Sequence, residues 1–336
     1  MSSEFSFIQQ IRQRALQASP NLSLGIGDDT AIWREQAGRE RLITTDLLIE
    51  NVHFKLDYTP LACLGHKALA VSLSDIAAMG GKPEFALLSL GLPKSQLANP
   101  AWQDFFDGYF ALARKHGVTL IGGDTSSSPD TLVVDSIVIG SCASGKAIRR
   151  SGAQVGDAIY VTGELGAAAT GLELLLRGEK YDATTNDLRQ AAIRAHLLPE
   201  PRLAFAQRLN SLAGAMMDVS DGLAQDLAHI CEESDVDAII DFDAVPIADC
   251  VRLVRPVKEE AFSLGISGGE DYELLLTTNP ANEAALQNLA TKCQLRLTRI
   301  GEIIVRRLPQ AKPQLFLRTA DSVDLLTVKG YDHFCR

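Results

Sequence analysis

The sequence predicts a two-domain protein in which each half has a mixed α/β or α+β fold. The chain has 336 residues, which is about twice the length of an ordinary domain. Segments with the two-residue hydrophobic period of strands are interspersed with segments of helical period from one end to the other. Hydrophobic residues make up 46% of the chain and charged residues 22%, so each half has enough apolar residues to form its own core.

The N-terminal half is expected to begin with an amphipathic helix at 4–17. Strands are predicted at 22–26 and 42–45, followed by a helix at 61–79 that is apolar on almost every side. A helix with no polar face is typical of one buried within a core. The remaining elements of this half are a strand at 84–92, a helix at 101–116 and strands at 119–122 and 132–141.

The stretch from Gly145 to Gly156 is basic and rich in small residues, which makes it the best candidate for a domain boundary. We therefore place the domains at 1–146 and 147–336. In the second domain the pattern again predicts intermixed strands and helices. The strands lie at 157–162, 238–242, 272–277 and 300–305. The helices lie at 165–176, 187–198, 201–213 and 221–234, with a further helix between the last two strands.

Charge and cysteine content exclude several classes of protein. The formal net charge of -10 disfavours non-specific binding to DNA or RNA, which needs a basic surface. The six cysteines form no CxxC pair and show no zinc-ligand or disulfide spacing, which favours free thiols in a reducing compartment. The N-terminus has no secretory signal, and no apolar run approaches the roughly 18 residues of a membrane span. We therefore expect a cytoplasmic protein.

Acidic residues occur at strand ends and turns in four places along the chain. Any one of them is explained by a turn or a helix cap, where Asp is common. Four together, in the loops where catalytic groups usually lie, indicate a functional site. The four are Asp28-Asp29 after Gly25-Ile26-Gly27, Asp46 after Thr44-Thr45, Asp124 after Gly122-Gly123, and Asp218-Val219-Ser220-Asp221-Gly222.

Asp75 stands out because it lies within the apolar helix predicted at 61–79. A buried carboxylate without compensation costs several kcal/mol, so it needs a cation or hydrogen bonds. Lys67 lies two turns earlier and is one candidate partner, and a bound metal ion is the other. Both explanations remain open on the sequence alone.

The types of candidate ligand indicate which metal ion would bind here. Hard oxygen ligands without clustered His or Cys favour Mg²⁺, Mn²⁺ or Ca²⁺ over zinc. An acidic pocket repels a polyphosphate unless divalent ions lie between them, so a nucleotide site here requires several metal ions.

The segment 140–147 fits GxxxxGK, but Ala147 replaces the hydroxyl residue that a P-loop needs. Gly25-Ile26-Gly27 lacks the third glycine of a dinucleotide fingerprint, and His53 and His333 have no evident nucleophile partner.

Together these motifs resemble the thiamine-monophosphate kinase family, which belongs to the aminoimidazole ribonucleotide synthetase-like superfamily. The resemblance extends in order over nearly the whole chain, and SGGEDYEL and the terminal GYDHF are its most specific parts. The matching segments are GIGDD at 25–29, TTD at 44–46, NVHF at 51–54, KALAVSLSDIAAMG at 67–80, IGGDT at 121–125, RSGAQVGD at 150–157, DVSDGL at 218–223, SGGEDYEL at 267–274 and GYDHF at 330–334.

The resemblance implies an activity and an assembly. The reaction is ATP-dependent phosphorylation of thiamine monophosphate to thiamine diphosphate, with several Mg²⁺ ions and ATP as co-substrate. The enzyme class is a phosphotransferase with a phosphate group as acceptor. The implied architecture is a homodimer whose N-terminal sheets pair into a shared barrel, flanked by C-terminal α/β domains that complete the active sites.

The resemblance also assigns residues. It implies catalytic roles for Asp46, Asp124 and Arg150, and nucleotide contacts at Gly123, Asp124, Arg150, Ser220 and the less well matched Tyr109. Substrate contacts fall at His53, Glu270 and Tyr331. The implied metal ligands are Asp29, Thr44, Thr45, Asp46, Asp75, Asp124, Asp218 and Asp221. The chain departs from the family pattern at Thr44, where serine is more frequent, and at Ser126–Pro129, which lacks the basic and glycine residues of some relatives.

Physical chemistry supports this reaction. The acceptor is a phosphate monoester with a second pKa of about 6, so it needs no strong general base. Positioning and neutralisation of two anions then dominate catalysis. Arg150 could pair with phosphate or be a solvated surface charge, and Tyr331 could stack on a thiazolium or pack in the core.

Two alternatives remain on the sequence alone. One is another ATP-dependent enzyme of the superfamily, such as aminoimidazole ribonucleotide synthetase or selenophosphate synthetase. The first cysteine, Cys63, lies too far along the chain for the reactive cysteine of the latter. The other is a catalytically inactive nucleotide-binding partner protein, which the intact aspartates argue against.

Overall fold

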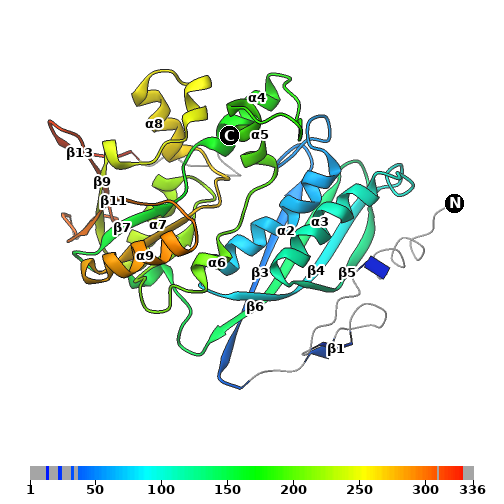
Figure 1. Cartoon of the computed structure of the whole chain (residues 1–336), viewed down its shortest axis with the longest axis horizontal. Coiled ribbons are helices and arrows are strands. Elements are labelled where there is room, and N and C mark those ends of the chain that lie inside the picture. Colours follow the sequence, from blue (N-terminus) through cyan, green and yellow to red (C-terminus); the bar gives the residue numbers. More distant parts are fainter. Residues whose placement is uncertain (1–12, 15–21, 25–31, 34–36, 309, 328–336) are drawn as a thin grey trace. The chain divides into compact units, whose positions relative to one another are not determined.

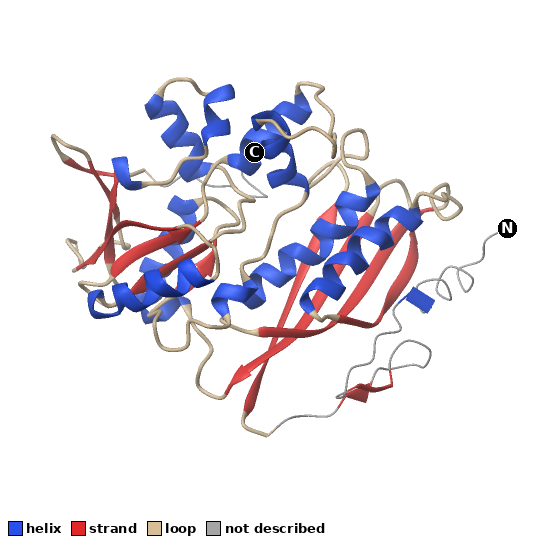
Figure 2. Cartoon of the chain, viewed as in Figure 1, coloured by secondary structure: helices blue, strands red, loops and turns tan. Residues whose placement is uncertain are grey.

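The fold is described from a computed structural model of the chain, covering residues 13–14, 22–24, 32–33, 37–308 and 310–327. The chain divides into two compact units. The first comprises Met1–Ile76 with Gly81–Gly145, and the second comprises Ala77–Gly80 with Lys146–Arg336. Both units combine helices with a sheet, which confirms the predicted fold class (Figures 1 and 2). Most residues of the predicted helix at 4–17 lie outside the described residues, as do Asp28, Asp29 and Tyr331.

The first unit is built on a four-stranded sheet in the order β3-β6-β4-β5. β6 pairs antiparallel with β3 and β4, whereas β4 and β5 are parallel and are joined through α3. α2 and α3 lie along one face of this sheet (Figure 1). The bounds are β3 Arg39–Ile49, α2 Leu61–Ala78, β4 Lys82–Pro93, α3 Trp102–His116, β5 Thr119–Ser128 and β6 Val133–Ala143, with a separate pair β1 Leu22–Leu24 and β2 Ile32–Trp33.

The two faces of this sheet differ in burial, as alternation along each strand requires. Side chains at even positions of β3 and β6 face α2 and α3, and Val134 and Val138 are fully buried there. Side chains at odd positions lie on the opposite side, which we call the outer face. Ile43 and Leu47 lie on the outer face with 68% and 48% of their surface exposed. The sheet therefore has one face covered by its own helices and one face with exposed apolar side chains.

α2 is the central core helix of the first unit. It is long and apolar enough to cross a membrane by length and composition, which corrects the expectation that no apolar run approaches that length. Most of its surface is buried, and it contains Lys67 and Asp75, as expected for a core helix. α2 and α3 approach closely because two glycines face the partner backbone. A Cβ added at Gly65 would clash with the carbonyl of Phe105, and one added at Gly108 would clash with the carbonyl of Ala62.

The second unit contains a seven-stranded mixed sheet in the order β13-β12-β9-β11-β7-β10-β8. β9 and β12 are parallel and the other pairs are antiparallel. The strands are β7 Ala158–Thr162, β8 Met216–Asp218, β9 Asp237–Asp241, β10 Leu274–Thr278, β11 Leu297–Ile304, β12 Leu315–Arg318 and β13 Val323–Leu325. The helices are α4 Ala167–Leu176, α5 Leu188–Leu197, α6 Leu203–Ala206, α7 Leu223–Ser234, α8 Lys258–Ser267 and α9 Glu283–Lys292.

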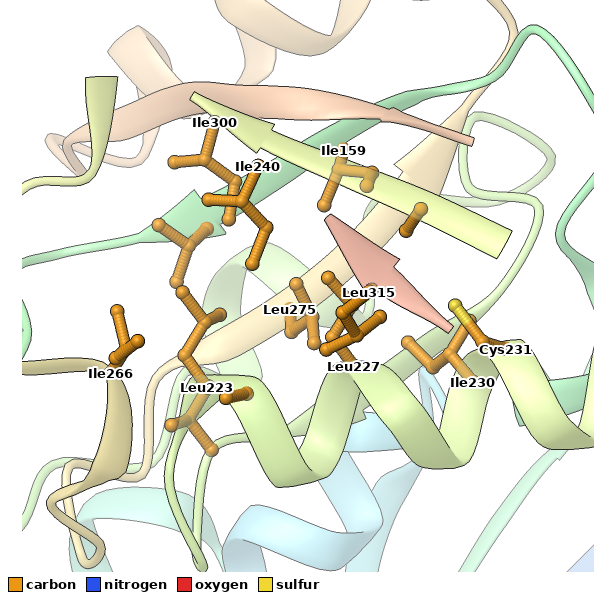
Figure 3. Close-up of a cluster of buried hydrophobic side chains, with 14 of the residues drawn as sticks. Ile159, Leu223, Leu227, Ile230, Cys231, Ile240, Ile266, Leu275, Ile300 and Leu315 are labelled. Atoms are coloured by element: carbon orange, nitrogen blue, oxygen red, sulfur yellow. The ribbon is translucent and has the colours of Figure 1, made fainter. Parts of the chain in front are cut away.

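The core of the second unit lies between this sheet and α7. Figure 3 shows Leu223, Leu227 and Ile230 of α7 pointing toward side chains of the sheet. These three residues follow the i, i+4, i+7 spacing of an amphipathic helix, so the sequence period accounts for the buried face. The packing fixes the start of α7, which follows directly on the Asp218–Gly222 loop.

The predicted helix at 201–213 is wrong in extent. Only Leu203–Ala206 forms a helix, and turns follow it. Asn210 has a φ of 50°, a left-handed conformation that asparagine tolerates and that ends helices. The apolar residues that suggested a longer helix, such as Leu209, are buried in the turns instead. β12 and β13 also lie beyond the elements that the hydrophobic pattern predicted.

The close crossing of α2 and α3 generates a test. Gly108→Ala should destabilise the protein by about 2 kcal/mol or more, because its Cβ must push the two helices apart. Helix propensity alone favours alanine by about 1 kcal/mol, so the expected sign is opposite to that of an unpacked helix site. The matched control is the exposed Ala111 of α3, where Ala111→Gly should cost about 1 kcal/mol. Denaturant unfolding measures both, and a Gly108→Ala protein as stable as the wild type would refute the close-packing account.

Candidate functional site

The Thr44-Thr45-Asp46 motif lies within β3 and directs its side chains to both faces of the sheet. On the helix-covered face, the Thr44 hydroxyl donates to Asp75 of α2. Asp46 lies on the same face and accepts a hydrogen bond from the Ser72 hydroxyl of α2, with an Oγ–Oδ2 distance of 2.8 Å. Thr45 points to the outer face, where its hydroxyl donates to Oδ1 of Asp135 on β6 at 2.6 Å. Within this strand, the three side chains therefore cannot all bind one ion.

Asp75 is linked to the Thr44-Thr45-Asp46 motif by a hydrogen bond from a hydroxyl group. Asp75 lies on α2 and has a hydrogen-bond donor in Thr44, so part of its burial cost is offset locally. Lys67 is also buried in α2, with 2% of its surface exposed. Whether Lys67 or a metal ion balances the negative charge of Asp75 therefore stays a prediction.

Negative charge is crowded around Asp46. Burial and the neighbouring carboxylates of Asp75 and Asp135 together raise the pKa of Asp46 to about 6, against the opposing hydrogen bond from Ser72. A cation bound beside this carboxyl would favour its ionised form and lower its pKa. All of these donors are hard oxygens, which fits Mg²⁺. Within residues 37–308 and the other described segments, no three His, Cys, Asp or Glu side chains converge to hold an ion alone. Magnesium usually takes one or two protein carboxylates and completes its shell with phosphate oxygens and water.

A second set of polar residues forms a row across the outer face. Asp135 of β6 is level with Ser89 of β4, which is level with Asp124 of β5. Strands lie about 4.8 Å apart, so the Cα atoms of Asp135 and Asp124 are about 10 Å apart. The preceding residue, Gly123, has a φ of 151°, and a Cβ there would clash with the carbonyl of Leu88. Position 123, beside Asp124, therefore has no room for a side chain, and a backbone without a side chain allows a phosphate to approach closely.

The Asp218–Gly222 motif forms the turn between β8 and α7 in the second unit. Asp218 is buried at the end of β8. Asp226 of α7, which the sequence motifs did not single out, holds this turn from below. Its Oδ2 accepts the backbone N–H groups of Ser220 and Asp221 at 3.1 and 3.3 Å. Burial raises the pKa of Asp226 to about 8, with Asp218 and Asp221 adding to the effect.

The SGGEDYEL motif packs directly on that turn. The N–H of Glu270 donates to the carbonyl of Ser220 at 2.7 Å, and the N–H of Tyr272 donates to that of Val219 at 2.9 Å. A Cβ at Gly269 would clash with the Ser220 carbonyl, which accounts for the glycine. Glu270 and Tyr272 have φ values of 68° and 49°, which non-glycine residues rarely adopt. Backbone strain of this kind is maintained by surrounding contacts and clusters at functional sites.

The three acidic residues of this motif have three different partners. Glu270 Oε2 lies 3.0 Å from Nδ1 of His196 on α5. Asp271 accepts the N–H groups of Gly166 and Ala168 at the start of α4, at 2.8 and 3.2 Å. Glu273 is buried and accepts hydrogen bonds from Arg202 at 2.7 Å and from Thr162 at 2.6 Å. Asp271 and Glu273 therefore fix the loop, while Glu270 keeps a partly exposed side chain.

The other predicted residues have varied surroundings. His53 Nδ1 accepts the N–H of Ile49 in the turn after β3. Arg150 lies exposed in a short 3₁₀ turn, Arg150–Gly152, whose carbonyl accepts the Ser234 hydroxyl. Tyr109 is completely buried among the aromatic side chains of α3, so it offers no surface to a nucleotide in this conformation. The roles assigned to these residues stay predictions.

The crowding around Asp46 predicts a pH-dependent response to magnesium. Because the folded-state pKa is raised from 3.8 to about 6, this group adds stability that is fully present below about pH 3.8 and is lost as pH rises through about 6. At pH 7.5, Mg²⁺ should therefore raise the melting temperature of wild type more than at pH 5. Asp46→Asn should remove most of that difference and should raise the melting temperature of the metal-free protein at pH 7.5. Equal magnesium effects at both pH values in wild type would contradict the charge-crowding account.

Comparisons with known proteins agree with the resemblance seen in the sequence. Residues 27–142 match the family model of the AIR synthase related protein, N-terminal domain, and residues 154–311 match that of its C-terminal domain. The thiamine-monophosphate kinase of Bacillus subtilis is 38% identical over 98% of this chain and 99% of its own length. The crystal structure of thiamine-monophosphate kinase from Stenotrophomonas maltophilia superposes with a TM-score of 0.82 at 37% identity, covering 95% of this chain and 96% of that one. The structure of AaThiL complexed with AMPPCP and TMP gives a TM-score of 0.75 at 29% identity, covering 99% and 97%.

Because the similarity is full-length and well above the level of fold likeness alone, the chain belongs to the thiamine-monophosphate kinase family, which is built from the two AIR synthase related domains.

Proposed function

We propose that the protein transfers the terminal phosphoryl group of ATP to thiamine monophosphate and forms thiamine diphosphate. The observation that carries this proposal is full-length similarity, at 38% identity, to a curated thiamine-monophosphate kinase. The related structure complexed with AMPPCP and TMP supports the pair of substrates. The protein is thus proposed to be a phosphotransferase with a phosphate group as acceptor.

The arrangement of the first unit suits this reaction physically. Both substrates are anions, and the acceptor is already largely ionised near neutral pH, so no strong base is needed. The main barrier is to bring two phosphates together in line. Magnesium, when bound, supplies neutralisation and alignment of phosphate oxygens. In the first unit we assign it to Asp46 and Asp75 with Thr44 on one face of the sheet. On the other face we assign separate ions to Thr45 and to Asp124, which lie on the two edge strands.

The remaining assignments complete the proposal. Asp29, Asp218 and Asp221 are proposed as further metal ligands, with the number of ions left to measurement. Gly123, Ser220 and the exposed Arg150 are proposed to contact the nucleotide, and Arg150 can offer two parallel N–H donors to phosphate. Tyr109 is the weakest nucleotide assignment because of its burial. His53, Glu270 and Tyr331 are proposed to contact thiamine monophosphate.

We also propose that the chain forms a homodimer through the outer face of its four-stranded sheet. Ile43 and Leu47 are exposed there, and exposed apolar groups on a sheet favour a partner surface. Pairing of two such sheets would give the shared barrel that the family resemblance implies. A soluble enzyme of the cytoplasm remains our prediction.

The decisive experiment is incubation with ATP, Mg²⁺ and thiamine monophosphate, followed by chromatographic detection of thiamine diphosphate and ADP. We expect equal amounts of both products and no reaction without a divalent cation. Asp46→Asn and Asp124→Asn should each reduce kcat by about 100-fold or more, because they remove the charge that holds the magnesium ions, which in turn position the phosphates. Asp130→Asn, an exposed aspartate in the turn between β5 and β6, is the matched control and should retain wild-type turnover.

Three outcomes separate the alternatives. No thiamine diphosphate at any magnesium concentration would sink the proposed activity. ATP consumption without thiamine diphosphate would favour another enzyme of the superfamily. Nucleotide binding without any turnover would favour a catalytically inactive partner protein.

A further inference from the structure

Asp135 lies beside the proposed magnesium ligands but belongs to none of the motifs that identified them. It lies on β6, where its Cα is level with Leu47 of β3 on one side and Ser89 of β4 on the other. Its Oδ1 accepts the hydroxyl of Thr45 at 2.6 Å. The side chain is half-buried on the outer face, in the row that ends at Asp124.

This hydrogen bond decides how the Thr45 oxygen faces a cation. A threonine hydroxyl has one proton and two acceptor lone pairs. When the proton is donated to a carboxylate, the lone pairs remain available to a metal ion. When the acceptor is missing, the hydroxyl rotates freely and can direct its proton at the ion instead. Groups that orient a ligand from outside the coordination shell typically change metal affinity by about 10- to 100-fold.

The same arrangement recurs on the other face of the sheet. There the Thr44 hydroxyl donates to Asp75, as the Thr45 hydroxyl donates to Asp135. Two consecutive threonines thus each donate to a carboxylate from a neighbouring element, one from α2 and one from β6. A single exposed threonine–carboxylate pair has an ordinary structural explanation, but paired orientation of both hydroxyls in one proposed ligand motif does not.

We propose that Asp135 is a positioning residue of the magnesium site, which holds the Thr45 hydroxyl with its proton directed away from the ion. Asp135 also adds negative charge to the outer-face row that contains Asp124. The inference rests on the proposed function, because it takes Thr45 as a ligand of the magnesium that accompanies ATP.

The test compares five variants in direct metal binding. Free Mn²⁺ is measured by electron paramagnetic resonance with the full-length protein and a non-hydrolysable ATP analogue, and Mg²⁺ half-saturation of turnover is measured in parallel. Asp135→Ala should weaken Mn²⁺ binding about tenfold, at the low end of the range because the hydrogen bond is exposed. Asp135→Asn keeps an acceptor for Thr45 and should stay within about threefold of wild type. Asp130→Ala removes the same charge from the turn between β5 and β6 and should have no effect.

Coupling with Thr45 separates positioning from a general structural role. Thr45→Val should weaken Mn²⁺ binding about as much as Asp135→Ala, and the double variant should be no weaker than either single variant. Unchanged Mn²⁺ affinity in a folded Asp135→Ala protein, equal losses in Asn and Ala variants, or multiplicative losses in the double variant would each overturn the inference. Failure of the proposed function is distinguishable, since wild type would then bind Mn²⁺ but form no thiamine diphosphate.

Discussion

Repulsion among carboxylates of one small sheet and of the helix α2 that covers it is the constraint on which the first unit depends. Asp46 is partly buried and has Asp75 and Asp135 as neighbours, so its ionised form is disfavoured in the metal-free protein. The hydroxyls of Thr44, Thr45 and Ser72 hold these carboxylates in place but cannot neutralise them. A divalent cation can neutralise them, and it also attracts an anionic substrate to an acidic protein. Such ions would reconcile the net charge of -10 with an ATP-dependent reaction.

Glycines set the positions of these groups by allowing backbones to touch. Gly65 and Gly108 bring α2 against α3, and α2 carries Asp75 and Ser72 toward β3. In the second unit, Gly269 lets the Glu270 loop lie on the carbonyl of Ser220. Close backbone contact is stiff because interiors are densely packed and resist small displacements. The charged groups therefore lie on closely packed elements of the backbone that resist displacement by their mutual repulsion.

Much of this could be predicted from particular residues. Asp75 was evident because a carboxylate in an apolar helix needs compensation, and the strand character of β6 was readable in its Val and Ile content. Asp135 could not be found in that way, because a polar residue at an outward position of a strand is ordinary. Only the pairing of β6 with β3 reveals its contact with Thr45. Asp226 did carry a signal, since it lies on the apolar stripe of α7 between Leu223 and Leu227. The helix expected at 201–213 was wrong in extent because apolar period alone does not register the turns that follow Ala206.

The central claim is that the carboxylates of the four-stranded sheet hold divalent cations for a phosphate-bearing ligand. Anomalous X-ray scattering from crystals grown with Mn²⁺ and a non-hydrolysable ATP analogue tests it most directly. The account predicts a manganese peak at bonding distance from a carboxylate oxygen of Asp124 or Asp46, with phosphate oxygens completing the shell. Manganese peaks confined to places remote from both carboxylates, with the nucleotide analogue bound, would contradict it.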